Sequence, residues 1–258
     1  MFKHAIVRTP GSTLTRGITS QPELGPPDYQ LALTQHSAYI RALESLGVKV
    51  SVLPPLEEYP DSCFVEDTAV LGENWAVISC PGAPSRKDET AHILPAIREL
   101  YPEVHIHRIT GPGTLEGGDV MQVEDTFYVG RSARTNDEGI RQFQEILRPY
   151  GCRVVPVKLH DALHLKTAVN YLSHGRLLVA GETGGGADFA GFEKIPIPPE
   201  EAYAANSLWV NDSVLVPAGF PCVEAAIRAL GYPVLPVDTS EYRKIDGGLS
   251  CLSLRAGR

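Results

Sequence analysis

The hydrophobic residues follow two alternating periods along this chain. Stretches with apolar residues at positions i, i+3 and i+4, the spacing of one helix face, are each followed by a short apolar run typical of strands. Three of the helical stretches end at a glycine, where a helix C-cap belongs. These helix-then-strand pairs occupy residues 39–53, 92–109, 143–157 and 224–237, and a worn fifth copy occupies 186–197. The recurrence predicts a repeated α/β unit.

Each helix-then-strand pair continues into two further short strands. These two-strand segments are 64–71 with 75–80, 119–123 with 126–130, 167–172 with 177–181, and 207–210 with 213–217. The last unit has one strand, 249–255, and we expect residues 2–9 to be its missing partner, which would close a ring and remove a free sheet edge. Five units of about 52 residues are a plausible repeat length. We therefore predict a five-fold α/β ring over a single domain, residues 1–258, rather than a doubly wound sheet, which would also alternate helices and strands.

Composition and charge narrow the class of protein. Hydrophobic residues make up 43% of the chain and charged residues 21%, which suits a packed core. The net charge of −8 argues against a nucleic-acid or anionic-membrane partner and suits an enzyme that takes a cationic small molecule. No apolar run approaches the ~18 residues of a membrane helix, and the N-terminus lacks the apolar core of a signal peptide. The five cysteines are widely spaced without a CxxC, so we expect free thiols in the cytoplasm and no structural zinc.

Reactive residue types gather at one position of each unit, between the single strand and the two-strand segment. Equivalent positions meet around the axis of a ring, so a carboxylate pair, a histidine, an asparagine and a cysteine are expected to converge. From Glu66, the steps are 50 residues to Glu116, 48 to His164, 42 to Asn206 and 45 to Cys251. Taken alone, each has a simpler interpretation, since a lone cysteine is usually a small buried hydrophobe and turn carboxylates are commonly caps.

The charges near these positions indicate the kind of ligand. Glu66, Asp67 and Glu116 stand in apolar strand starts, where an uncompensated charge is costly and a cationic ligand would offset that cost. Arg86 and Arg134 each follow a two-strand segment, and a guanidinium fork suits a carboxylate, although solvated surface arginines are more common. A cysteine and a histidine beside carboxylates point to nucleophilic catalysis on a planar cation that also carries a carboxylate. Arginine-like molecules fit this description.

Six segments then carry a resemblance to a known family. They are 61–67 (DSCFVED), 81–86 (PGAPSR), 115–119 (LEGGD), 132–136 (SARTN), 163–167 (LHLKT) and 237–251 (VDTSEYRKIDGGLSC). With these segments, which run nearly end to end, the chain resembles the dimethylarginine dimethylaminohydrolases of the pentein superfamily. The resemblance implies a five-bladed α/β propeller, in agreement with the repeat pattern.

The resemblance also implies a role for each matching residue. Cys251 matches the nucleophile and His164 the general acid and base, while Glu116 and Asp67 match the carboxylates that hold the guanidinium, with Glu66 supporting Asp67. Further matches are Asp61 and backbone groups near Ile18 and Ile245 for the substrate α-amine, Arg86 and Arg134 for its carboxylate, and residues 14–28 for a mobile lid.

The implied reaction converts methylated arginines to citrulline through a covalent thiouronium on Cys251, with no metal or organic cofactor. We further expect a neutral Cys251 thiol at rest, with His164 as the one cation among the carboxylates. An arginine deiminase is the close alternative, but those enzymes carry an acid where this chain has Lys166. A non-catalytic arginine-binding pentein is another alternative, against which Cys251 and His164 together argue. The expected partners are a small-molecule substrate and, at most, a second copy in a homodimer.

Overall fold

The computed structural model describes residues 1–160 and 162–257. Within them the chain forms five three-stranded sheets. It divides into two compact units, one made of Met1–Val65 with Asn206–Arg258 and the other of Glu66–Ala205. We call them unit 1 and unit 2 and describe each by itself. The prediction of a single domain over the whole chain stays a prediction.

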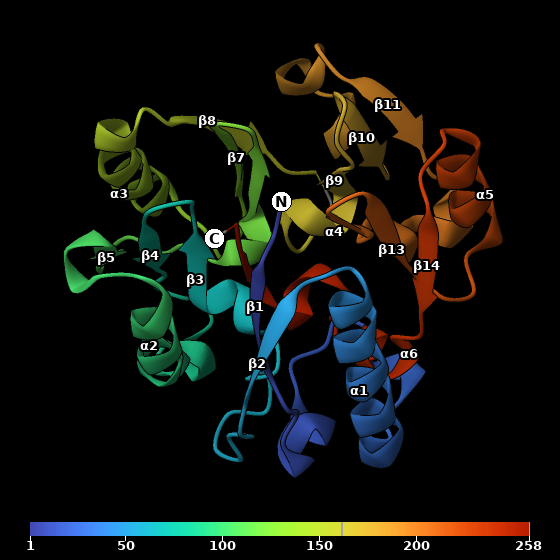
Figure 1. The fold of residues 1–258 in the computed structure, drawn as a ribbon, viewed down its shortest axis with the longest axis horizontal. Helices are drawn as coiled ribbons and strands as arrows, with labels where there is room; N and C mark the ends of the chain where they lie inside the picture. Colours follow the sequence, from blue (N-terminus) through green and yellow to red (C-terminus); the bar gives the residue numbers. More distant parts are fainter. Residues whose placement is uncertain (161, 258) are drawn as a thin grey trace. The chain divides into compact units, whose positions relative to one another are not determined.

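Unit 2 contains three of the sheets, and each begins with an antiparallel hairpin. In every case a third strand then pairs in parallel with the second strand of the hairpin. The elements of the first two sheets are β3 (Ala69–Leu71), β4 (Ala76–Ile78), α2 (Glu89–Leu100) and β5 (Ile106–Arg108), then β6 (Val120–Val123), β7 (Thr126–Arg131), α3 (Asp137–Leu147) and β8 (Arg153–Lys158). The third sheet contains β9 (Val169–Tyr171), β10 (Arg176–Val179) and β11 (Glu193–Pro196). In Figure 1, α3 lies beside β8, against which it packs.

Unit 1 contains the other two sheets. One has the same order, with β12 (Leu208–Val210), β13 (Ser213–Pro217), α5 (Pro221–Ala229) and β14 (Val234–Val237). The other joins the two ends of the chain through β15 (Leu254–Ala256), β1 (His4–Arg8), α1 (Tyr29–Ser45) and β2 (Lys49–Leu53). Here β1 pairs antiparallel with β15 and parallel with β2, so that His4 lies opposite both Ala256 and Lys49. The predicted pairing of the N-terminal strand with the last strand is therefore confirmed.

The structure corrects the boundaries of the repeat. We expected each helix and strand to lead into the following hairpin, whereas the single strand pairs with the hairpin that precedes its helix. The worn fifth copy does supply a strand, β11, but two 3₁₀ turns, Thr183–Gly185 and Ala187–Phe189, stand in place of its helix. Gly186 and Gly191 lie inside the expected helix and disfavour it, because each glycine costs an α-helix about 1 kcal/mol relative to alanine.

Local capping explains the limits of the longest helix. Asp28 caps the start of α1, where its side chain accepts a hydrogen bond from Leu31 N at 2.9 Å. Gly47 follows the end of α1 with a φ of +80°, a conformation that favours glycine. The buried face of α1 includes Tyr39 and Leu43, which belong to the hydrophobic core of unit 1.

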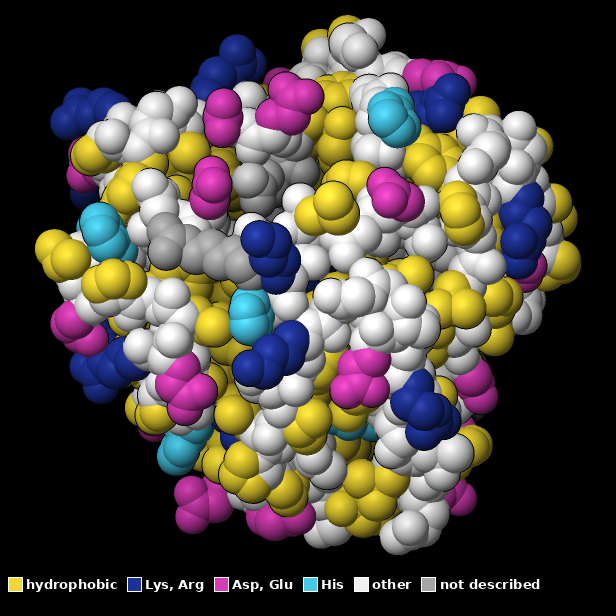
Figure 2. Space-filling view, viewed as in Figure 1, with side chains coloured by type: hydrophobic (Ala, Val, Ile, Leu, Met, Phe, Trp, Pro, Cys, Tyr) yellow, Lys and Arg dark blue, Asp and Glu magenta, His cyan; other side chains and the backbone are white. Residues whose placement is uncertain are grey.

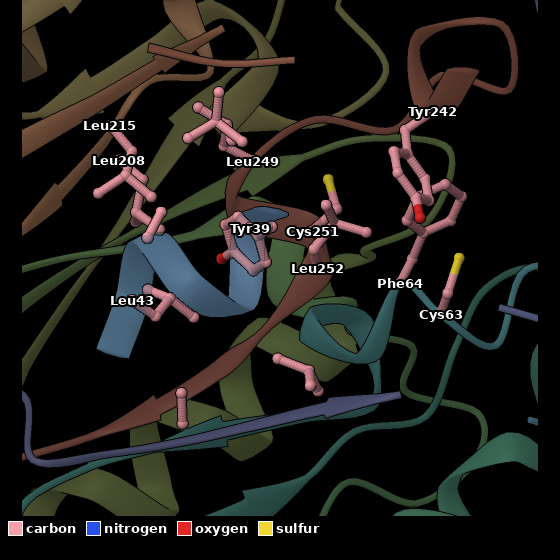
Figure 3. Close-up of a cluster of buried hydrophobic side chains, with 14 of the residues drawn as sticks. Tyr39, Leu43, Cys63, Phe64, Leu208, Leu215, Tyr242, Leu249, Cys251 and Leu252 are labelled. Carbon is pink, nitrogen blue, oxygen red and sulfur yellow. The ribbon is translucent and has the colours of Figure 1, made fainter. Parts of the chain in front are cut away.

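Figure 3 shows this core of unit 1, with Tyr39 on α1 near Cys251 and Leu252. The rings of Phe64 and Tyr242 meet edge to face in the same cluster, with 6.2 Å between their centroids. Acidic and basic side chains are interspersed over the face of the molecule in Figure 2. Among the described residues, no helix combines the length and the apolar character needed to cross a membrane.

Candidate active site

A short helical turn precedes the first strand of each sheet, at the positions where the reactive residues stand. At the first and the last of these positions we expected strands, over 64–71 and 249–255, because the flanking residues are apolar. A single turn instead leaves backbone N–H groups free to bind side chains from neighbouring segments. The turns are Val65–Thr68 with Glu66 and Asp67, Gly117–Asp119 after Glu116, Leu165–Ala168 (α4) after His164, Pro199–Ala205 before Asn206, and Ser250–Leu252 with Cys251.

In unit 2, His164 and Glu116 form a buried hydrogen-bonded pair. His164 Nε2 lies 2.7 Å from Glu116 Oε2. The other carboxylate oxygen, Glu116 Oε1, accepts hydrogen bonds from Gly82 N at 3.0 Å and Ala83 N at 3.2 Å. Arg134 adds a longer contact from NH1 to Glu116 Oε1 at 3.4 Å. The Glu116 side chain is fully buried, so these four donors fix both of its oxygens.

Asp67 stands beside this pair and is held by a cation of the chain itself. Its Oδ1 accepts from Gly118 N at 2.9 Å, and its Oδ2 lies 2.6 Å from Arg86 NH1. The guanidinium of Arg86 also binds Glu89, with NH2 2.8 Å from Glu89 Oε2. The side chains of Arg86, Asp67 and Glu89 are each at most 5% exposed. Arg86 therefore bridges two buried carboxylates.

The glycine pair before Asp119 permits this close packing. A Cβ at Gly117 would lie 2.0 Å from the backbone oxygen of Glu66. A Cβ at Gly118 would lie 2.9 Å from both Asp67 Oδ1 and the His164 ring. Because only glycine fits at these two positions, the Glu-Gly-Gly-Asp segment brings the Asp67 turn and the His164 turn together.

The neighbouring charges set the protonation of the pair. Burial by itself would lower the pKa of His164, but three carboxylates outweigh burial and raise this pKa to about 9. These carboxylates belong to Asp67, Glu116 and Asp119. Burial would raise the pKa of Glu116, but the hydrogen bond and charge of His164, with two arginines, lower it to about 2. At neutral pH the pair is therefore an imidazolium and a carboxylate.

Asp119 anchors the turn that follows His164. Its Oδ1 accepts from Leu165 N at 3.0 Å, and its Oδ2 accepts from the hydroxyl of Ser132 at 2.6 Å. Asp119 is fully buried, and burial raises the pKa of its carboxyl group. It thereby connects the His164 turn to the loop that carries Arg134.

Lys166 pairs with Glu66, with Nζ 2.5 Å from Oε1. The resemblance gave Glu66 the task of supporting Asp67, which stays a prediction, and the structure adds an ion pair between Glu66 and Lys166. The expectation that His164 is the one cation among the carboxylates is wrong, because Arg86, Arg134 and Lys166 each contact one of them.

Among the described residues, Asp67, Glu116 and His164 have ligand atoms within 4.8 Å of one another, the spacing of a metal site. A metal ligand must be deprotonated, and the pKa of His164 is about 9. At neutral pH the imidazolium proton therefore competes with any metal. The expectation of no metal or cofactor stays a prediction.

In unit 1, Cys251 lies in the middle of a 3₁₀ turn that a glycine pair precedes. Cys251 is buried, and its N–H donates to Gly248 O at 3.2 Å. A Cβ at Gly247 would lie 2.2 Å from the ring of Phe64, and one at Gly248 would lie 2.6 Å from Asn206 Cγ. The close contacts with Phe64 and Asn206 therefore require glycine at both positions.

Unit 1 also brings together the three residues expected at the substrate α-amine. Asp61 is buried, and its Oδ1 accepts from Ile18 N at 3.0 Å. A Cβ at Gly17 would lie 3.1 Å from both Asp61 Oδ1 and Ile245 Cδ1. Asp61, the Ile18 backbone and Ile245 therefore line one small region of unit 1.

Asp246 ties the expected lid to the segment that leads to Cys251. Its carboxylate accepts from Ser20 N at 2.5 Å, from Ser20 Oγ at 2.9 Å and from Gln21 Nε2 at 3.1 Å. We did not identify Asp246, Glu89 or Asp119 from the sequence. Their signal was weak, since each is a single acid beside a motif residue.

The fold and the site together define a class of protein. The five three-stranded α/β sheets are the blades expected of an α/β propeller. Unit 2 holds an imidazolium among buried carboxylates and arginines, and unit 1 holds a cysteine in a turn that a glycine pair precedes. Residues 28–183 match the family described as N,N dimethylarginine dimethylhydrolase, eukaryotic. The N(G),N(G)-dimethylarginine dimethylaminohydrolase of Pseudomonas aeruginosa is 52% identical over 99% of this chain and 100% of its own length. The chain belongs to the dimethylarginine dimethylaminohydrolase family.

Two solved structures show the same similarity. The Pseudomonas aeruginosa enzyme, as a cysteine-to-serine mutant complexed with citrulline, has a TM-score of 0.97 at 52% identity and covers 99% of both chains. A histidine-to-glycine dimethylarginine dimethylaminohydrolase, as an adduct with S-methyl-L-thiocitrulline, has a TM-score of 0.96 at 52% identity and covers 99% of this chain and 100% of its own.

Proposed function

We propose that this chain hydrolyses Nω-methylated arginines, namely asymmetric dimethylarginine and monomethylarginine, to citrulline and dimethylamine or methylamine. The observation that carries this proposal is the buried His164–Glu116 pair, because it keeps a proton on a histidine that a leaving amine needs. Membership of the family and the citrulline complex of the Pseudomonas aeruginosa relative support the same reaction.

The proposed mechanism begins at Cys251. As the substrate guanidinium binds, the Cys251 thiol gives its proton to solvent, and the resulting thiolate adds to the guanidinium carbon. His164 then donates its proton to the departing amine, which leaves as the C–N bond breaks. A thiouronium then remains on Cys251. His164, now neutral, takes a proton from a water molecule, which attacks the thiouronium carbon and releases citrulline with the cysteine sulfur as leaving group. The remaining hydroxyl proton of the added water leaves as the C–S bond breaks and reprotonates the Cys251 sulfur. One water is consumed, one amine is produced, and both residues return to their starting state.

The remaining residues serve substrate binding in this proposal. Asp67 and Glu116 hold the guanidinium. Glu66, which pairs with Lys166, supports Asp67. Further contacts come from Arg86 and Arg134 to the substrate carboxylate, and from Asp61 and the backbone near Ile18 and Ile245 to the α-amine. Since Arg86 binds both Asp67 and Glu89, this assignment requires one arginine to serve the carboxylate clamp while it also holds Asp67.

A parallel assay tests the substrate class. Citrulline and amine release are measured with dimethylarginine, monomethylarginine and arginine, and Cys251→Ser is the blank. We expect both methylated arginines to react well and arginine poorly, because Lys166 with Glu66 occupies the position of an acid that a deiminase carries. Faster turnover of arginine would support the deiminase alternative, and no citrulline from any of the three would support a non-catalytic binding protein.

The proposal places the enzyme in the cytoplasm. The five cysteines are odd in number and widely spaced without a CxxC, which suits a reducing compartment. Sedimentation of the purified chain would test the further prediction of a homodimer.

A further inference from the structure

Asn206 stands at the fourth of the five equivalent positions, and the proposed mechanism gives it no task. It follows the turn Pro199–Ala205 and precedes β12. The residue is 3% exposed, although an asparagine side chain carries two polar groups that each need a partner when buried. A buried amide at this position therefore has a structural reason.

Both ends of the Asn206 amide bind the residue before Cys251. Asn206 Oδ1 accepts from Ser250 N at 2.8 Å, and Asn206 Nδ2 donates to Ser250 Oγ at 3.1 Å. The amide also packs against Gly248, where a Cβ would lie 2.6 Å from both Asn206 Cγ and Oδ1. Asn206 thus holds the Cys251 turn from a point 44 residues away in the sequence.

This turn needs an outside cap. It contains only Ser250–Leu252, and the apolar side chain of the preceding residue, Leu249, cannot accept a hydrogen bond from the N–H groups of the turn. Isolated turns of this length are not stable in water, because nucleation fixes several residues for one hydrogen bond. Asn206 supplies the acceptor that an N-cap residue supplies in an ordinary helix.

We propose that Asn206 is a positioning residue that aims the Cys251 thiol for attack. The proposal rests on the proposed role of Cys251 as nucleophile. An asparagine suits this task because one amide offers an acceptor to Ser250 N and a donor to Ser250 Oγ at once. In the proposed function other residues bind the substrate. The loss of Asn206 should therefore lower kcat more than it changes KM.

The test compares Asn206→Ala and Asn206→Asp with a matched control, Asn211→Gly. Asn211 lies in the turn between β12 and β13. Its Oδ1 accepts from Phe2 N at 2.8 Å, and its Nδ2 donates to Leu46 O at 2.8 Å. Its φ of +54° suits glycine, so this control removes comparable asparagine hydrogen bonds without adding strain. The folding of each variant is checked by circular dichroism.

Two readouts are taken for each variant. The first is kcat and KM with dimethylarginine, and the second is the rate of alkylation of Cys251 by iodoacetamide against pH, resolved by mass spectrometry. A misplacement of about 1 Å can lower a rate by about 10²-fold, so we expect Asn206→Ala to lose about that much in kcat with KM changed less than about threefold. Its alkylation profile is expected to differ from wild type, and both readouts are expected to stay unchanged in Asn211→Gly.

Asn206→Asp keeps the acceptor for Ser250 N and can accept from Ser250 Oγ, but it adds a negative charge next to the Cys251 turn. We expect partial rescue of kcat relative to alanine and an alkylation midpoint raised by about 1 pH unit, because a nearby carboxylate disfavours a thiolate. Should Asn206→Ala fail to fold, Asn206→Asp and Ser250→Ala replace it in the test. The same two quantities are measured, kcat and the midpoint of Cys251 alkylation against pH.

The proposal is overturned if Asn206→Ala matches Asn211→Gly in both readouts. It is also overturned if Asn206→Ala raises KM and leaves kcat unchanged. These results are separable from failure of the proposed function. If the wild-type chain releases no citrulline, the proposed function fails, whereas the alkylation profile of Cys251 still decides whether Asn206 positions its thiol.

Discussion

The guanidinium of Arg86 lies 2.6 Å from the carboxylate of Asp67, and both side chains are buried. The resemblance assigned these two residues to opposite ends of the substrate, yet the structure joins them. Arg86 also holds Glu89 at 2.8 Å, so one arginine neutralises two carboxylates. The charges of Asp67 and Glu89 are therefore balanced by the chain itself, and in the proposed binding mode a substrate guanidinium would share Asp67 with Arg86.

This arrangement predicts a large loss of stability when Arg86 is removed. Arg86→Met leaves Asp67 and Glu89 as buried carboxylates without their cation, and breaking a buried pair costs about 3–5 kcal/mol. The free energy of unfolding in urea measures this loss. Arg141→Met is the control, since Arg141 also binds two carboxylates, Glu138 at 2.7 Å and Glu145 at 2.6 Å, but on the exposed face of α3. We expect little change there, and equal losses in both variants would contradict the importance of burial.

The Lys166–Glu66 pair predicts a coupling between two substitutions. Lys166→Met leaves the Glu66 carboxylate, 4% exposed, without the cation at 2.5 Å, and should lower stability. Glu66→Gln should restore much of this loss in the double variant, since the buried charge is then gone. Thermal unfolding of the two single variants and the double variant gives the coupling energy. Strictly additive losses would mean that the ion pair is not what holds the two side chains.

Part of this site could be predicted from the sequence, and particular residues show why. Similar steps of 50, 48 and 42 residues placed Glu116, His164 and Asn206 at equivalent positions, because repeat spacing reflects local geometry. The pairing of β1 with β15 followed from the need of the last strand for a partner.

Other features depend on contacts that no local pattern encodes. We expected strands where the turns Val65–Thr68 and Ser250–Leu252 stand, since apolar residues flank a strand and a turn of this kind alike. Glu89 is three residues from Arg86 and looks like an ordinary helix start, so its burial comes only from tertiary packing. The two hydrogen bonds of Asn206 reach 44 residues along the chain, and sequence spacing gave its position but not its partner.

The contact between Asp246 and Ser20 predicts that the expected lid opens more readily in Asp246→Asn. The carboxylate accepts three hydrogen bonds from Ser20 and Gln21, and an amide replaces one accepting oxygen by a donor. Asparagine tolerates the φ of +58° at this position, so the backbone is preserved. We expect faster hydrogen exchange at the amide of Ser20, measured by mass spectrometry of peptides from residues 14–28. Unchanged exchange in that peptide would show that Asp246 does not hold the lid.

The raised pKa of His164 predicts the alkaline limit of activity. Its folded value is about 9 against 6.5 unperturbed, so the imidazolium persists at neutral pH and is lost as pH rises through about 9. The proposed mechanism needs this proton for the leaving amine, and kcat/KM should therefore fall above pH 9. Glu116→Gln removes the carboxylate at 2.7 Å and should move this limit to lower pH. A limit that stays in place in Glu116→Gln would mean that another group sets it.

His36 predicts a loss of stability in acid that is independent of the active site. It lies on the buried face of α1, 3% exposed, its Nε2 has no hydrogen-bond partner among the described residues, and burial lowers its pKa to about 4. A lowered folded pKa means that the unfolded chain binds a proton first, so stability is full above about pH 6.5 and declines as pH falls toward 4. The difference of about 2.5 pH units corresponds to about 3 kcal/mol. His36→Leu has no group to protonate, and its urea unfolding free energy should fall less than that of wild type between pH 7 and 4. Parallel declines in the two proteins would assign the acid sensitivity to other groups.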